Sequence, residues 1–119
     1  PNIVGGRDVH LLFGVMRDKN WSPMLRALAR IAAELVVTRP RQARSADPWL
    51  VAAASPIPVR VIDDPVRAYD DLRASCGPSD VVLATGSLFL VGDLLAAIDP
   101  ARAADAERER AATRLAARG

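Results

Sequence analysis

Almost unbroken apolar runs alternate with amphipathic stretches along the chain. Residues 9–16 (VHLLFGVM) form the first apolar run, a pattern typical of a strand buried on both faces of a parallel sheet. After a polar turn (RDKN), apolar residues recur at helical spacing from Met24 to Leu35. Asn20 or Ser22 can cap this helix, with Pro23 in its first turn. The pattern therefore predicts a strand followed by an amphipathic helix.

The same strand and helix unit is predicted three more times. Residues 35–38 (LVVT), 59–62 (VRVI) and 81–85 (VVLAT) have the composition of short buried strands. Helix starts follow each of them, in the order Asp47 with Pro48, Asp64 with Pro65, and Gly86 with Ser87. This alternation predicts an α/β fold, a Rossmann-like, mostly parallel sheet with right-handed crossovers and helices on both faces.

The chain is long enough for one domain. Its 119 residues, 50% hydrophobic and 25% charged, are typical of a folded globular protein. We expect residues 9–98 to form the α/β domain and residues 1–8 to be the end of an interdomain linker. Residues 99–119 are predicted to be a helical tail, frayed or docked on a neighbouring domain, because Leu115 is their only large apolar residue. Since Pro1 falls within a predicted loop or strand, we expect a piece of a longer protein.

Charge, cysteine content and hydropathy exclude several classes of partner. A net charge of only +2 gives no strong basic field, so nucleic acid is not expected. The single cysteine, Cys76, excludes an internal disulfide and a cysteine zinc cluster and favours a reducing compartment. No apolar run approaches the ~18 residues of a membrane helix, and no signal peptide is recognisable. We therefore expect a cytoplasmic protein with no membrane partner and no metal site of its own.

Two loops are candidates for a functional site. In open α/β sheets, ligands bind beyond the carboxyl ends of the strands, at the point where the strand order reverses. Residues 17–20 follow the first predicted strand and residues 85–89 follow the fourth. We expect these two strands to be adjacent and parallel, as in the usual doubly wound orders, so that both loops face one crevice.

Each loop contains residues suited to binding an anion. Gly86 and Ser87 stand at the start of a helix, where free backbone N–H groups and a hydroxyl can hold an anion or simply cap the helix. Lys19 is the only lysine among sixteen basic residues, which favours a site that needs a compact ammonium, although one such residue can arise by chance. Asp18 can orient that ammonium or cap the next helix.

Other chemically notable residues have structural interpretations. We interpret His10 as a packed core or edge histidine, Cys76 as an inert, partly buried thiol, and Arg39, Arg41 and Arg44 as a solvated loop cluster. The sequence contains no Walker phosphate loop, no H-E-x-x-H and no G-x-S-x-G. No set of residues in the chain completes an active site by itself.

Four motifs in order, FGVMRDKN, LVVTRPR, RSADP and VVLATGSLFLVGD, give the chain a resemblance to a known family. Over residues 9–98 it resembles the carboxyl-terminal domain of folylpolyglutamate synthase and dihydrofolate synthase, a branch of the Mur ligase superfamily. The resemblance implies an ATP-dependent, three-domain amide ligase. ATP phosphorylates the carboxylate of a folate or of dihydropteroate, and the amine of L-glutamate attacks the acyl phosphate. ATP and Mg²⁺ are bound mainly by the amino-terminal and central domains, which this chain lacks.

The resemblance also implies roles for particular residues. Lys19 is expected to face the acyl phosphate or the glutamate carboxylate, with Asp18 placing it. The backbone at Gly86, together with Ser87 and Leu88, is expected to hold the amino-acid carboxylate, and Arg44 is a candidate for a second carboxylate contact. On this interpretation the chain is inactive alone.

Two alternatives remain open from the sequence. The chain can belong to another Mur-type ligase, such as one that adds an amino acid to a cell-wall precursor. It can also be a stand-alone α/β binding module without catalysis.

Overall fold

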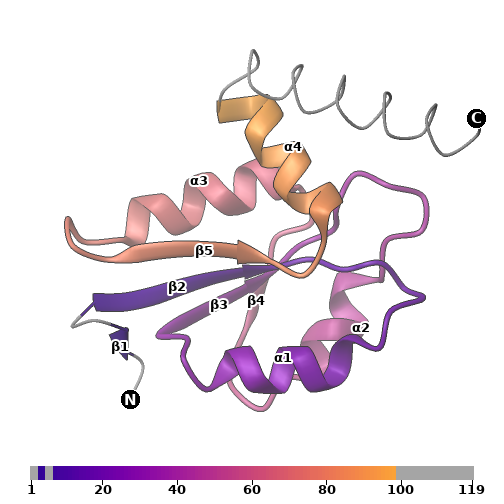
Figure 1. Cartoon of the computed structure of the whole chain (residues 1–119), viewed down its shortest axis with the longest axis horizontal. Coiled ribbons are helices and arrows are strands. Elements are labelled where there is room, and N and C mark those ends of the chain that lie inside the picture. The colour runs from indigo at the N-terminus through magenta and orange to yellow at the C-terminus, as the bar shows by residue number, and fades with distance from the viewer. Residues whose placement is uncertain (1–2, 5–6, 99–119) are drawn as a thin grey trace, which may run out of the picture.

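A four-stranded parallel sheet organises the chain. The computed structural model describes residues 3–4 and 7–98 (Figure 1). The sheet has the spatial order β5 (Val81–Thr85), β2 (Arg7–Phe13), β3 (Glu34–Val37) and β4 (Arg60–Val61). A short strand, β1 (Ile3–Val4), pairs antiparallel with the start of β2. The predicted α/β fold is confirmed.

The strand order reverses between β2 and β5. From β2 the chain steps outward to β3 and then β4, and it returns to form β5 on the other side of β2. The register between these two strands runs in parallel from Val9 opposite Val81 to Phe13 opposite Thr85. The expected adjacency of the first and last long strands is therefore confirmed.

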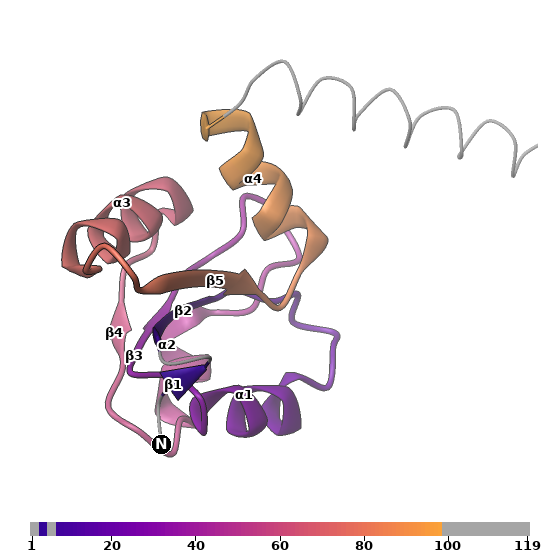
Figure 2. The same ribbon diagram turned by 60° about the vertical axis from the view of Figure 1, so that its left-hand side comes forward.

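Helices cover both faces of the sheet. Helices α1 (Trp21–Ala29) and α2 (Pro48–Ala53) lie on one face, and α3 (Pro65–Ser75) and α4 (Leu88–Ile98) lie on the other (Figures 1 and 2). Because side chains alternate along a strand, Leu11 and Phe13 of β2 pack toward α1 and α2 while Leu12 packs toward α3 and α4. The central strand is buried on both faces, which explains its continuous apolar sequence.

The largest differences from the sequence prediction are at the ends of β2 and α1. β2 ends at Phe13 and not at residue 16, because Val15 and Arg17 pair with the loop that follows β3. α1 ends at Ala29, well before Leu35, since Leu35 is fully engaged in β3 opposite Leu11. In both places a tertiary pairing overrides the local apolar pattern.

The predicted boundaries are only partly visible in the structure. β2 begins at Arg7, inside the segment expected to end a linker, and the tail predicted for residues 99–119 lies outside the described residues. No described helix is both long and apolar enough to span a membrane.

Candidate functional site

The chain just after β2 contacts the turn after β5 at the carboxyl edge of the sheet, the edge from which both loops singled out from the sequence extend. The Gly14 N–H donates a hydrogen bond to the carbonyl oxygen of Thr85, at 3.2 Å. Gly86 follows with φ +113°, and a Cβ there would lie 2.6 Å from the Gly14 carbonyl oxygen. Only glycine tolerates this combination of dihedral and close approach. The β2 and β5 loops are thus in direct backbone contact.

The loop carrying Lys19 is fixed by the loop that follows β3. The Arg17 N–H donates to the carbonyl of Arg44, and the Ala46 N–H donates to the carbonyl of Val15, both at 2.8 Å. An antiparallel bridge between Met16 and Ser45 lies between these bonds. A further bond from the Lys19 N–H to the Met16 carbonyl, at 3.3 Å, closes the turn. We call residues 15–19 and 44–46 the braced loops.

Asp18 and Arg44, both predicted site residues, form an ion pair across the braced loops. The hydrogen bond from Arg44 lowers the pKa of Asp18 below its ordinary value, and the charge of Lys19 adds to that effect. The side chains of Arg44 and Asp18 are 65% and 48% exposed, so both charges face water. Within residues 3–4 and 7–98, Lys19 forms no ion pair.

The turn from β5 into α4 forms a second cluster of predicted residues. Gly86, Ser87 and Leu88 line an open pocket of about 290 Å³, together with Met24 of α1. The Phe89 N–H donates to the Ser87 hydroxyl oxygen at 3.1 Å, which is the capping role; the hydroxyl hydrogen can still be donated. Lys19, Asp18 and Arg44 lie outside the lining of this pocket.

Exposed apolar side chains gather around this edge. Five of the seven large apolar residues exposed in the described part of the chain stand in the first turns of helices that begin at the carboxyl edge. They are Met24 in α1, Trp49 and Leu50 in α2, and Leu88 and Phe89 in α4. We call these five residues the apolar rim of the carboxyl edge.

Arg39 and Arg41 border a different pocket. It is open, has a volume of about 580 Å³ and lies at the carboxyl ends of β3 and β4. Arg39 pairs with Asp63 at 2.7 Å, and Arg41 pairs with Asp64 at 2.8 Å. The three arginines of the cluster expected from the sequence are exposed, but each forms an ion pair with an aspartate that the sequence analysis did not predict as its partner.

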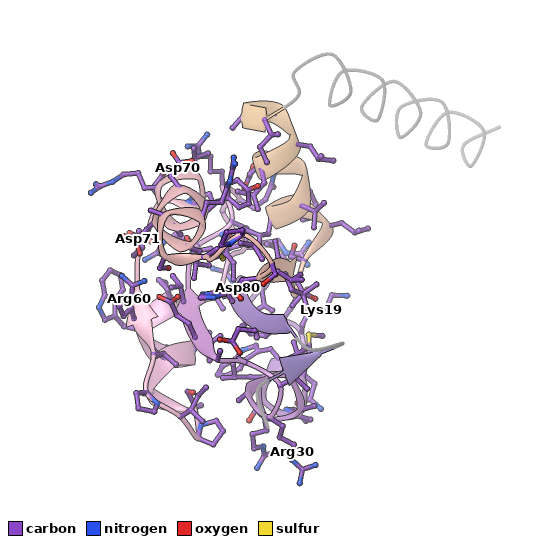
Figure 3. All side chains as sticks on the ribbon, turned by 90° about the vertical axis from the view of Figure 1, so that its left-hand side faces the viewer. Lys19, Arg30, Arg60, Asp70, Asp71 and Asp80 are labelled. Atoms are coloured by element: carbon purple, nitrogen blue, oxygen red, sulfur yellow. The ribbon has the colours of Figure 1, made fainter. Side chains whose placement is uncertain are left out.

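His10 lies at the opposite, amino-terminal edge of the sheet and is buried. Its Nδ1 is 2.7 Å from an oxygen of Glu34, and its Nε2 is 3.1 Å from an oxygen of Asp80. Burial alone would lower the pKa of His10, but the hydrogen bonds and charges of the two carboxylates outweigh it and raise the pKa. Glu34 also accepts hydrogen bonds from Arg60 and Ser75. Figure 3 views the molecule from this edge and labels Arg60 and Asp80. The packed histidine was expected from the sequence, whereas its carboxylate partners were missed.

We next consider possible metal ligands and the single cysteine, Cys76. No group of three His, Cys, Asp or Glu residues suited to a metal ion occurs in the described ranges. Cys76 is half-buried, and burial raises the pKa of its thiol, as expected for an inert cysteine.

Comparison with known proteins identifies relatives that are named as folylpolyglutamate synthases. A curated protein of Haloferax volcanii, named a probable bifunctional folylpolyglutamate synthase/dihydropteroate synthase, is 31% identical over 90 residues, 72% of this chain and 11% of that protein. The folylpolyglutamate synthase of Thermotoga maritima matches with a TM-score of 0.64 and 32% identity, over 75% of this chain and 20% of that one. A bifunctional folylpolyglutamate synthase/dihydrofolate synthase of Yersinia pestis, complexed with AMPPNP and a Mn ion, matches with a TM-score of 0.71 and 23% identity. The match covers 76% of this chain and 22% of that one.

These coverages define the relationship. The chain spans about a tenth of the curated relative and about a fifth of the two solved structures. The profile of the family described as "Mur ligase, glutamate ligase domain" matches residues 2–88. The chain therefore belongs to the family of Mur ligase glutamate ligase domains, and it is similar to a segment of the folylpolyglutamate synthases named above.

Proposed function

We propose that this chain supplies the amino-acid half of the active site of an ATP-dependent ligase that adds L-glutamate to a folate or to dihydropteroate. The pairing of β2 with β5 supports the proposal, because the loop with Lys19 and the Gly86 to Leu88 turn follow neighbouring strands at the edge where the strand order reverses. The relatives are folylpolyglutamate synthases, which gives the class of substrate.

Lys19 and Asp18 are the proposed catalytic residues. The exposed ammonium of Lys19 would face the acyl phosphate or a carboxylate of the incoming glutamate, where it stabilises negative charge. The braced loops hold its backbone, and Asp18 lies beside it. A hydrogen-bonded backbone that carries an exposed ammonium group is suited to stabilising a negative charge that develops during the reaction.

The turn at Gly86, Ser87 and Leu88 is the proposed carboxylate site. Backbone N–H groups at the start of α4 point toward the carboxyl edge, and the Ser87 hydroxyl can donate to a bound anion. Arg44 is the proposed second carboxylate contact. Its Nη2 donates to Asp18, and the guanidinium has further N–H groups that could donate to a substrate carboxylate.

ATP and Mg²⁺ would be held mainly by the amino-terminal and central domains of the parent ligase. The sequence has no phosphate loop, and the described residues include no metal-binding group. When bound, the nucleotide and metal would supply the phosphoryl group that activates the acid. The apolar rim at Met24, Trp49 and Leu88 suits contact with those domains, and closing the edge would keep water from a hydrolysable acyl phosphate.

The test is the Lys19→Ala variant of the full-length ligase that carries this domain. We expect glutamate-dependent ADP formation to fall about a hundredfold to a thousandfold, roughly 2.5 to 4 kcal/mol, because one donor to a developing charge is lost. Binding of the acid and of ATP should change little. Arg30→Ala, an exposed cation at the other end of α1, is the control and should leave the rate unchanged.

Two outcomes would contradict the proposal. Wild-type turnover in Lys19→Ala would show that this lysine is only a surface residue. Ligation of a cell-wall precursor acid, with no reaction of folate or dihydropteroate, would assign the domain to another Mur-type ligase. Steady-state assays in which the acid, ATP and glutamate are varied in turn measure the turnover of Lys19→Ala and show which acid is ligated.

A further inference from the structure

We propose that Asp93 is a positioning residue, which fixes the loop after β3 (residues 38–47) against α4. Asp93 is the only charged residue of α4 (Leu88–Ile98), whose other residues are apolar or glycine. One of its carboxylate oxygens accepts a hydrogen bond from the Arg41 N–H at 2.8 Å. This inference rests on the proposed function, because the two segments that Asp93 joins carry proposed contacts to the substrate.

The hydrogen bond satisfies a backbone donor that has no other acceptor in the described part of the chain. Within residues 3–4 and 7–98, no backbone carbonyl accepts the Arg41 N–H. Hydrogen bonds to an ionised carboxylate are stronger than those between neutral groups, and Asp93 is half-buried, so water competes less for its oxygens. The loop lies beside α4 in both ribbon views (Figures 1 and 2).

Arg41 stands near the start of a closed turn that carries Arg44 at its far end. The Ser45 hydroxyl donates to the Pro40 carbonyl oxygen at 2.5 Å, and the Ser45 N–H donates to the carbonyl of Gln42 at 3.1 Å. Pro40 is buried, which anchors the start of the turn in the fold. Because these bonds make the turn one compact unit, a shift of Arg41 is passed on to Arg44.

Asp93 supplies the link between this turn and α4. Among the described hydrogen bonds, it makes the only one between the loop after β3 and that helix. The Arg41 guanidinium also pairs with Asp64 of the α3 N-terminus, but these side chains are 55% and 38% exposed, and such a pair contributes little to stability. The braced loops fix the far side of the turn relative to β2, whereas Asp93 fixes its near side relative to α4. Asp93 therefore sets the spacing between Arg44 and the turn at Ser87.

A residue with this role should affect substrate binding more than turnover. Asp93 touches no reacting atom, and it holds two proposed contacts in place before glutamate arrives. Without it, the loop must be ordered by the substrate, and this cost is the same in the ground state and in the transition state. The half-saturating glutamate concentration should then rise, while turnover stays the same.

The test uses Asp93→Ala and Asp93→Asn in the full-length ligase. Asp93→Ala should raise the half-saturating glutamate concentration about threefold to tenfold, with turnover and the half-saturating concentrations of ATP and of the acid unchanged. Asp93→Asn keeps an oxygen that can accept the Arg41 N–H, so it should stay within about twofold of the wild type. Asp70→Ala is the control, since Asp70 is an exposed carboxylate in the middle of α3, and it should behave as the wild type (Figure 3).

Amide hydrogen exchange of the ¹⁵N-labelled chain measures the hydrogen bond itself. The Arg41 amide should exchange about threefold to tenfold faster in Asp93→Ala than in the wild type, and at the wild-type rate in Asp93→Asn. Alanine favours a helix, so Asp93→Ala should fold.

Three results in the ligase would overturn the positioning role. They are wild-type glutamate dependence in Asp93→Ala, equal impairment in Asp93→Asn, and a uniform loss of activity toward every substrate. Wild-type exchange of the Arg41 amide in Asp93→Ala would overturn it as well, even where the ligase proposal stands. The ligase proposal is judged separately, by the effect of Lys19→Ala on glutamate-dependent ADP formation.

Discussion

Replacement of Gly86 by alanine tests whether the close contact between the β2 and β5 loops determines the shape of the site. Gly86 has φ +113°, a conformation that residues with a side chain rarely adopt. An added Cβ would lie 2.6 Å from the Gly14 carbonyl oxygen and 2.9 Å from a methyl group of Val15. Gly14 cannot move away easily, because its N–H is bonded to Thr85.

Two contributions determine how far Gly86→Ala should lower the free energy of unfolding. Holding a residue with a side chain in a sparsely populated backbone region costs about 1 to 3 kcal/mol. Forcing a methyl group against buried backbone and Val15 costs a further 1 to 3 kcal/mol or so. We expect Gly86→Ala to lower the free energy of unfolding by about 2 to 6 kcal/mol, a large part of the 5 to 15 kcal/mol typical of a domain.

Urea denaturation followed by circular dichroism measures the change. Gly92→Ala is the matched control, since Gly92 lies inside α4 and an added Cβ there would meet no atom within 4 Å. That variant should be more stable than the wild type by about 0.5 to 1 kcal/mol, because alanine favours the helix. If Gly86→Ala unfolds with the wild-type free energy and the wild-type slope, the loop contact is not as tight as the structure indicates.

Three further predictions concern other parts of the molecule. Because the pKa of His10 is raised above its ordinary 6.5, its charge stabilises the fold below that pH, and the benefit is lost as the pH rises through the raised value. Across that pH range, the free energy of unfolding of the wild type should therefore fall by about 1 to 2 kcal/mol relative to that of His10→Gln, as measured by urea titration. If the free energies of unfolding of the two proteins change in parallel with pH, the charged hydrogen bond to Glu34 is contradicted. In the full-length ligase, Ser87→Ala should raise the half-saturating glutamate concentration with little change in turnover, and a fall in turnover alone would exclude a ground-state carboxylate contact. The isolated chain should show no binding heat with ATP and Mg²⁺ in calorimetry, and micromolar affinity would refute a nucleotide site in other domains.

The apolar pattern was sufficient to predict the sheet and the edge at which both candidate loops begin. Each of the four βα units repeats the same local signal, and the rule on strand order then predicts that residues 17–20 and 85–89 follow neighbouring strands at one edge. Element ends were predicted less well. The apolar run through residue 16 does not distinguish a strand that continues from a chain that leaves the sheet to pair with residues 44–46.

The ion pairs could not be predicted because their partners are far apart in sequence. Glu34 and Asp80 lie 24 and 70 positions from His10, and no spacing rule joins them. The same holds for Asp18 and Arg44, which were chosen singly from the sequence and are paired by the tertiary fold. Hydrophobic periodicity records which way a residue faces, whereas charge pairing depends on the register of distant strands.

The strand order also has a consequence for how the protein folds. β5 is the last strand in the described part of the chain, yet it pairs with β2, the first of the long strands described and therefore the earlier of the two to be synthesised. While the intervening residues are being synthesised, β2 can pair with β3 on one side, and on its other side residues 9–13 lack the strand partner that β5 later provides. Closure of the sheet therefore waits for residues 81–85, and until then the chain presents an apolar edge on which chaperones or other nascent chains can act.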